Sequence, residues 1–257
     1  MRNIRLLLEF DGTEFKGWQR QNNVRTVQGT LEDAARDLFG SDVSIVGAGR
    51  TDAGVHAVGY ACNFHVQSGL PCERIIPALQ SRLPEDVVVL GGSDAAAFFH
   101  ARYHASARRY VYRITTAPTA LWRRTRLVVR HTVDVPAMNE AVQQLLGTHD
   151  FTSFMPAGTG VNPVCNVAEA RVERRESLIT VTLEADRFLH HMVRTIVGTL
   201  LDVGRGRIGP EQISSVLRTR DRGAAGRTAP AHGLTFVKAS YPRDAGTEPP
   251  AVSPPGN

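Results

Sequence analysis

The chain has 257 residues, of which 42% are hydrophobic and 21% charged, as in compact globular proteins of one large or two modest domains. No apolar run approaches the roughly 20 residues that span a bilayer, and the first residues lack the ordered regions of a signal peptide, so we expect a cytoplasmic protein with no membrane partner. Three scattered cysteines, at positions 62, 72 and 165, are too few for a disulfide framework or a zinc site.

The positive charge is concentrated in the second half. The net charge is +5, with −2 over residues 1–105 and +7 over residues 106–257. A basic half of this kind is typical of proteins that meet phosphates. However, 28 of the 30 basic residues are arginine, which a GC-rich genome supplies without selection for binding. An ordinary solvated surface therefore stays open as the alternative.

In the first half, apolar periodicity and turn residues predict alternating strands and helices. A strand over 4–10 ends at the turn signal Asp11-Gly12. An amphipathic helix follows between Thr26, which is placed to cap its start, and Gly40, which is placed to end it. Further elements expected here are strands at 43–46, 57–66 and 87–90, and a helix after Pro71 that includes Leu79 and Leu83 and that Pro77 kinks or restarts.

A second round begins with the alternating strand 108–114. The most regular helical pattern of the chain runs from Leu189 to Leu201, with apolar residues at i, i+3, i+4 and i+7. Further elements expected here are a helix over 138–146 with Pro136 near its first turn and Gly147 after its end, a hairpin of strands 167–172 and 178–183, a short helix that opens at Pro210, and a strand over 234–241.

Two rounds of strands and helices predict an α+β fold. We expect two ferredoxin-like (RRM-like) halves whose mixed, mainly antiparallel sheets join around a central basic cleft. The expected halves are residues 1–105 and 106–241. Residues 242–257, which are rich in proline and poor in apolar residues, predict a disordered tail.

One loop presents a single carboxylate. The segment Gly49-Arg50-Thr51-Asp52-Ala53-Gly54-Val55-His56-Ala57 holds Asp52 between two glycines, on a tight excursion between two predicted strands. Glycine permits unusual backbone shapes and close approach of a ligand, and loops often carry function. Asp52 is therefore the leading candidate for chemistry. The alternative is an aspartate that caps a turn through its side chain.

Tyr110 lies on the alternating strand 108–114. The alternation places Tyr110 and Tyr112 on one face and Arg109 and Arg113 on the other. An aromatic ring can stack on a base while guanidinium groups hold phosphates, as in RNA-binding sheets. The alternative is that both tyrosines are ordinary half-buried strand residues.

Arg194 lies at the edge of the apolar stripe of its predicted helix. A partly buried guanidinium there needs a partner, and a carboxylate is the natural one. The alternative is an arginine whose stem covers apolar surface while its charged end stays in water. His190 and His191 would point about 100° apart on this helix and no Glu-x-x-His pattern accompanies them, so we expect no metal site.

Several segments in order along the chain carry a family resemblance. They are Phe10-Asp11-Gly12, Gly17-Trp18-Gln19-Arg20-Gln21, the loop 49–57, Phe99-His100-Ala101-Arg102, Ala107-Arg108-Arg109-Tyr110-Val111-Tyr112, Asp150-Phe151-Thr152-Ser153-Phe154 and 190–198. Over residues 10–236 the chain resembles the tRNA pseudouridine synthase A family.

The resemblance implies isomerisation of uridine to pseudouridine at positions 38, 39 and 40 in the anticodon stem-loop of tRNA, without cofactor or metal. It also implies a homodimer. Asp52 corresponds to the nucleophile, Tyr110 to the tyrosine that packs on the target base, Arg194 to the basic residue that pairs with the aspartate, and Arg50 to the arginine that helps extrude the nucleotide. Whether Asp52 attacks the uracil ring or the ribose stays open.

The sequence departs from the family pattern at Pro77, which is unusual within its helix, and in one further segment. Where the family usually carries a basic residue after a proline, this chain has Asn162-Pro163-Val164-Cys165-Asn166. This departure concerns RNA contact and none of the proposed catalytic positions. A non-catalytic RNA-binding module, using the same tyrosine strand and arginines, is the alternative function.

Overall fold

The computed structural model describes residues 1–242. Contacts divide the chain into two compact units. The first comprises Met1–Ser106 together with the described residues from Phe236 on, and the second comprises Ala107–Thr235. The division after Ser106 lies one residue from the expected one, but the last strand, expected in the second half, groups mainly with the first. From residue 243 on, the expected tail lies outside the described residues.

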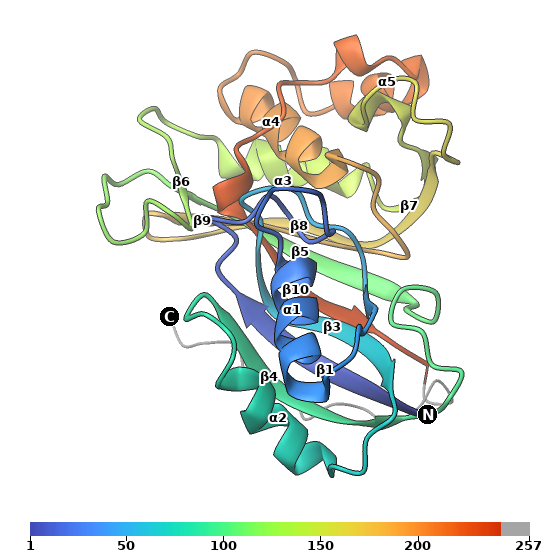
Figure 1. Cartoon of the computed structure of the whole chain (residues 1–257). Helices are drawn as coiled ribbons and strands as arrows, with labels where there is room; N and C mark the ends of the chain where they lie inside the picture. Colours follow the sequence, from blue (N-terminus) through green and yellow to red (C-terminus); the bar gives the residue numbers. More distant parts are fainter. Residues whose placement is uncertain (243–257) are drawn as a thin grey trace. The chain divides into compact units, whose positions relative to one another are not determined.

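The first unit is a sheet covered by two helices. Its elements in chain order are β1 (Arg2–Phe10), α1 (Val27–Phe39), β2 (Ile45–Gly47), β3 (His56–Val66), α2 (Cys72–Gln80), β4 (Val87–Ala95) and β10 (Leu234–Ser240). The strand path is β4-β1-β3-β10, and β2 pairs with β3. Strand β1 is antiparallel to both of its neighbours. Helices α1 and α2 lie over one face of this sheet (Figure 1).

Strand β1 is buried on both faces. Ile4, Leu6 and Leu8 are fully buried, while Asn3 and Arg5 on the other face are only 3% exposed. The Asn3 side chain donates to the carbonyl of Phe99 over 2.9 Å. The guanidinium of Arg5 lies 5.1 Å from the centre of the Phe99 ring. The central strand thus anchors the segment after β4 that carries one of the resemblance motifs.

Helix α1 confirms the capping prediction. The hydroxyl of Thr26 accepts a hydrogen bond from the amide of Gly29. Gly40 ends the helix with a φ of 70°, in the left-handed region that favours glycine.

Helix α2 does not restart at Pro77, so of the two expectations at this residue only the kink stays a prediction, and the helix ends earlier than expected. It runs through this proline, and Leu83 lies beyond its end. Pro77 lies one turn after Glu73 and deprives the helix of a single hydrogen bond to that carbonyl. The buried side chains of Ile75 and Leu79 flank Pro77 and hold the helix on the sheet.

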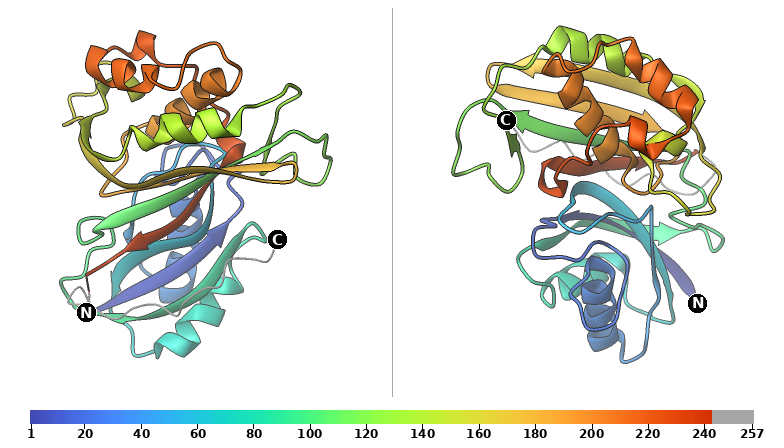
Figure 2. Two further views of the ribbon diagram at one scale, coloured as in Figure 1. Left: turned by 180° about the vertical axis from the view of Figure 1, so that it is seen from behind. Right: turned by 90° about the horizontal axis from the view of Figure 1, so that it is seen from above.

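The second unit is also a sheet with helices on one face (Figure 2). Its elements are β5 (Ala107–Thr115), β6 (Leu127–Val128), α3 (Val135–Gln143), β7 (Gly147–Asp150), β8 (Val164–Arg175), β9 (Leu178–Ala185), α4 (Met192–Gly204) and α5 (Gln212–Thr219). The strand path is β5-β9-β8-β7. These pairings are antiparallel, whereas β6 pairs with β5 in parallel. The mixed, mainly antiparallel α+β prediction is confirmed.

Two details of the second unit differ from the expectation. Gly147 begins β7 instead of following directly on α3, which ends at Gln143. Helix α4 begins at Met192, three residues after the start of its apolar pattern, because His191 takes a φ of 62° that a right-handed helix excludes. The predicted hairpin is confirmed: β8 and β9 flank Glu176 and Ser177.

Among the described residues, no helix combines the length and apolar character required to cross a membrane. The ferredoxin-like character of each half and the basic cleft stay predictions.

Candidate active site

Asp52 lies on the loop between β2 and β3. These strands pair antiparallel, with Ile45 opposite Phe64 and Gly47 opposite Cys62, and the loop enters β3 at His56, before the part of β3 that pairs with β2. The strand-loop-strand prediction is confirmed. Asp52 is half-buried. Arg50, on the same loop, is exposed.

The turn around Asp52 is closed by main-chain atoms. The amide of Val55 donates to the carbonyl of Asp52 over 3.2 Å. Gly54, at the third position of this turn, has a φ of 78°, which a residue with a Cβ rarely adopts. The main chain of Asp52 and Val55 thereby closes the turn.

A second segment braces the loop from outside. The amide of Trp18 donates to the carbonyl of Thr51 over 3.1 Å, and the amide of Gly54 donates to the carbonyl of Phe15 over 3.2 Å. A Cβ on Gly17 would lie 2.5 Å from the Thr51 carbonyl oxygen. Only glycine permits so close an approach. The motif that contains Gly17 is therefore part of the support of the Asp52 loop, a role that the sequence alone did not indicate.

Buried side chains hold both ends of the loop. At its start, the hydroxyl of Tyr60 donates to the carbonyl of Gly49, and the Tyr60 ring lies 4.3 Å from that of Trp18. At its end, Nδ1 of His56 accepts a hydrogen bond from the amide of Gly12 over 3.1 Å. A loop tied at both ends can present a carboxylate in a fixed place.

Thr51 carries an unusual group for so buried a residue. It is 8% exposed, and within residues 1–242 its hydroxyl has no hydrogen-bond partner. Buried hydroxyl groups without a partner cost free energy. Thr51 directly precedes Asp52 in the sequence, so this energetically unfavourable hydroxyl belongs to the candidate site.

Tyr110 lies on β5 opposite Leu183 of β9. It is 8% exposed, and its ring meets that of Phe188 edge to face at 5.2 Å. Tyr112, two residues on, is fully buried and donates to the carbonyl of Pro230 over 2.8 Å. Burial raises the pKa of Tyr112, against the opposing charge effect of Arg194. Tyr112 is thus a core residue.

The basic face predicted for β5 is largely neutralised at its centre. Arg109 forms ion pairs with Glu184 over 2.6 Å and with Glu169. Arg113 donates to the hydroxyl of Thr235 over 2.9 Å. Because two carboxylates already neutralise its guanidinium, Arg109 is poorly suited to bind phosphates.

Arg194 lies in the first turn of α4, as its place on the apolar stripe predicted, and it is half-buried. Its Nε donates to the carbonyl of Ala229 over 2.8 Å, and the amide of Ala229 donates back to the carbonyl of Arg194. A Cβ on Gly198, one turn on, would meet the carbonyl of Arg227 at 1.6 Å. The chain at 226–229 therefore packs along α4 and fixes one edge of the guanidinium, which does not simply extend into solvent.

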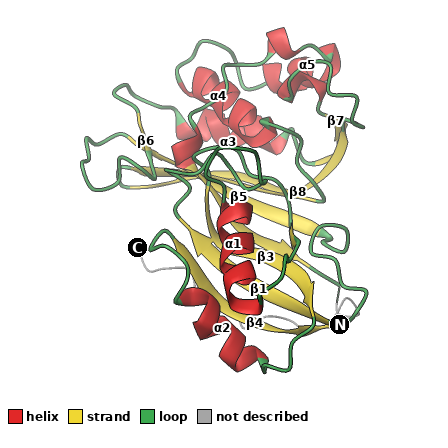
Figure 3. Ribbon diagram, in the orientation of Figure 1, coloured by secondary structure: helices red, strands yellow, loops and turns green. Residues whose placement is uncertain are grey.

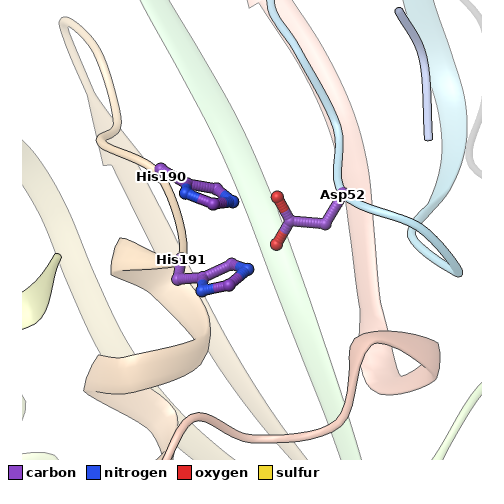
Figure 4. A group of neighbouring side chains, drawn as sticks. All are labelled: Asp52, His190 and His191. Atoms are coloured by element: carbon purple, nitrogen blue, oxygen red, sulfur yellow. The ribbon is translucent and has the colours of Figure 1, made fainter. Parts of the chain in front are cut away.

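His190 and His191 lie before α4 and not on it, which corrects one step of the sequence reasoning. The centroids of their rings are 3.8 Å apart. Figure 4 draws these two rings and the side chain of Asp52. The argument that helix geometry directs the histidines apart does not apply, because His191 adopts a left-handed conformation. The absence of a metal site stays a prediction without that support.

The four residues expected at the site are divided between the units. Arg50 and Asp52 share one loop of the first unit, whereas Tyr110 and Arg194 belong to the second. Sequence reasoning missed the bracing role of Gly17, although Gly17 begins one of the segments that carry the family resemblance.

A family model described as tRNA pseudouridine synthase matches residues 7–104 and 141–242. Three proteins, each called tRNA pseudouridine synthase A, are similar over most of their length. One from Acetivibrio thermocellus is 42% identical, covering 94% of this chain and 100% of the relative. One from Clostridium kluyveri is 38% identical with the same coverage. One from Halalkalibacterium halodurans is 42% identical, covering 91% of this chain and 90% of the relative. On this likeness, together with the braced loop that carries Asp52, the chain belongs to the tRNA pseudouridine synthase A family of isomerases.

Proposed function

We propose that this chain isomerises uridine to pseudouridine at positions 38, 39 and 40 in the anticodon stem-loop of tRNA, with Asp52 as the nucleophile and no cofactor. The observation that carries the proposal is the half-buried Asp52 on a turn closed by its own main chain and braced by Gly17. The names of the relatives support tRNA as the substrate.

The reaction defines what the site must do. The N1–C1′ glycosidic bond of uridine breaks, the uracil turns, a C5–C1′ bond forms, C5 releases a proton and N1 gains one, so that the composition of the nucleotide is unchanged. The base must leave its stack and be shielded from water while it is detached. A carboxylate can form the covalent intermediate that divides this change into easier steps. Attack on the uracil ring and attack on the ribose are both compatible with a carboxylate at Asp52.

The other residues have distinct proposed roles. Arg194, whose Nε donates to the carbonyl of Ala229, pairs with the Asp52 carboxylate, which a planar guanidinium does well. Tyr110 packs on the target uracil and limits how far the detached ring moves. Arg50, exposed two residues before Asp52, contacts the nucleotide as it leaves its stack.

Replacement of Asp52 tests the proposal. We expect Asp52→Ala to keep most of the tRNA affinity and to abolish pseudouridine formation, because loss of a carboxylate does not weaken phosphate contacts. The measurement is single-turnover tritium release from tRNA labelled at C5 of uridine, with filter binding in parallel. Glu85→Ala, at an exposed acidic position of the first unit, is the control and retains activity. Tritium release at the wild-type rate by Asp52→Ala contradicts the assignment.

Two variants of Tyr110 distinguish a stacking role of its ring from a chemical role of its hydroxyl. We expect Tyr110→Phe to lose little of the single-turnover rate, since the ring remains, and Tyr110→Ala to lose most of it. Circular dichroism of both variants checks the fold, because Tyr110 is nearly buried. Equal rates for Tyr110→Ala and the wild type exclude the stacking role.

Membership of an enzyme family disfavours the non-catalytic RNA-binding module. Tritium release by the wild-type chain excludes that module, and binding without release supports it. We further propose that the chain forms a homodimer. We also propose that it acts in the cytoplasm, since its proposed tRNA substrate is found there. For the first unit, the order β1-α1-β2-β3-α2-β4 with path β4-β1-β3 and β2 on β3 supports the ferredoxin-like proposal.

A further inference from the structure

The second unit carries a closed, exposed loop that the roles above leave unused. It comprises residues 116–126, here called the Trp122 loop, and it connects β5 to β6 (Figure 3). The parallel pairing of Ile114 with Leu127 and Thr115 with Val128 brings its two ends together. Inside the loop, the carbonyl of Trp122 accepts hydrogen bonds from the amides of Thr125 and Arg126 at 3.0 and 2.9 Å. The loop therefore has a defined shape of its own.

The tip of the Trp122 loop displays large apolar side chains. Leu121 is 85% exposed and Trp122 is 46% exposed, whereas Trp18, the other tryptophan, is 4% exposed. The guanidinium of Arg126 lies 4.4 Å from the centre of the Trp122 ring. This contact orients the indole, and a substantial part of the residue stays open to a ligand.

The chain on either side of the loop carries only positive formal charge. Residues 95–133 contain eight arginines and no aspartate or glutamate. Considering only the part of the chain that the structure describes, no carboxylate lies within 4.0 Å of Arg123 or Arg126. Burial, together with the charge of Arg126, lowers the pKa of Arg113. Unlike Arg109, therefore, Arg123 and Arg126 have no carboxylate in ion-pair distance among the described residues.

We propose that the Trp122 loop is an RNA-binding element, in which the indole of Trp122 stacks on an unpaired base of the tRNA and Arg123 and Arg126 hold the flanking phosphates. This inference rests on the proposed tRNA substrate and adds a contact outside the residues assigned to catalysis. An open aromatic ring beside unneutralised guanidinium groups matches how proteins hold single-stranded nucleotides. A second copy of the chain or an apolar protein partner fits less well, because association through this tip would bring these unneutralised arginines into the interface.

Tryptophan fluorescence gives a direct test, since the chain has two tryptophans and one is buried. We expect purified bulk tRNA to quench the emission of the wild-type chain. In Trp122→Phe, which keeps an aromatic ring, only the tRNA-induced quenching of Trp18 remains, and the affinity for tRNA changes by less than about threefold. Quenching of equal size in the wild type and Trp122→Phe overturns the stacking contact.

Binding measurements test the energetic role. Trp122→Ala is expected to weaken tRNA binding about tenfold, in line with the loss of one stacked base. The double variant Arg123→Ala/Arg126→Ala is expected to make the slope of log affinity against log salt shallower by roughly 1.5, because the loss of two phosphate contacts lowers the number of counterions that binding releases. The matched control is Arg171→Ala, whose guanidinium is already paired with Glu169 at 3.1 Å, and it binds within twofold of the wild type.

The outcomes keep the two proposals apart. If the wild-type chain forms pseudouridine but Trp122→Ala and the double arginine variant bind tRNA normally, this inference is wrong and the proposed function stands. If binding falls as expected but the wild-type chain forms no pseudouridine, the catalytic proposal fails and the RNA contact stands. A change of oligomeric mass in Trp122→Ala by sedimentation, with unchanged tRNA binding, identifies the loop as a contact between copies and overturns the inference.

Discussion

Gly17 shows how one residue sets the place of the Asp52 loop. Its φ of +90° and the 2.5 Å approach of a Cβ to the Thr51 carbonyl leave no room for a side chain. We expect Gly17→Ala to displace the loop and to lower the single-turnover rate at least tenfold, with a loss of about 1–3 kcal/mol in the free energy of unfolding.

Gly49→Ala is the matched control for Gly17→Ala. Gly49 lies on the same loop, but a Cβ there meets nothing within 4 Å. The rate and the thermal unfolding midpoint of Gly49→Ala should stay close to the wild-type values. Equal losses in both variants would show that the loop tolerates no change at all, and the bracing role of Gly17 would lose its support.

Tyr112 gives a prediction for alkaline pH. Burial raises its pKa above the ordinary value near 10, so the folded state favours the protonated phenol. The resulting stability is present below about pH 10 and is lost as the pH rises further. Tyr112→Phe should lose about 1 kcal/mol at neutral pH with the hydrogen bond to Pro230, and its denaturant midpoint should fall less steeply above pH 10 than that of the wild type. Parallel alkaline slopes for the two proteins would contradict this.

At the scale of elements, local signals decided what could be predicted. Thr26 and Gly40 predicted the ends of α1 because a cap depends on neighbours within one turn. The start of α4 was predicted three residues early, since apolar spacing does not reveal the left-handed backbone of His191. The loop of Asp52 followed from its flanking strands. Its brace at Gly17 did not, because that contact joins residues more than 30 positions apart.

The cap of α1 can be measured alone. Thr26 is 2% exposed and its hydroxyl accepts from Gly29 over 3.2 Å. We expect Thr26→Ala to cost about 1 kcal/mol in urea unfolding. Thr30→Ala, inside the same helix, is the control and should cost less, because replacement by alanine favours a helix interior. A smaller loss at Thr26 than at Thr30 would contradict the capping role.

At the scale of the whole molecule, sequence order and spatial order disagree at β10. The strand follows the second unit in the chain, yet it is hydrogen-bonded to β3 of the first. Phe236 is fully buried, and its ring lies 5.0 Å from that of Tyr60. Apolar periodicity predicted the strand, but it carries no information about the partner, which is set by contacts across more than 150 residues.

Phe236 links the two ends of the first unit. We expect Phe236→Ala to lower the free energy of unfolding by about 3–5 kcal/mol and to speed amide hydrogen exchange in β3 more than in β8. Lys238→Ala, at an exposed position of the same strand, should leave both unchanged. Faster exchange confined to β8 would contradict the placement of this side chain in the first unit.

The late position of β10 has a consequence for synthesis on the ribosome. When residues 1–106 have emerged, the nascent sheet still lacks the strand that pairs with β3, and more than 120 further residues must be translated before it arrives. Until then the part of β3 that pairs with β1 but not with β2 offers unpaired backbone groups on its other side, which other chains can join. The first part to be made is therefore among the last to be completed, and a chaperone that shields a strand edge would act during this interval.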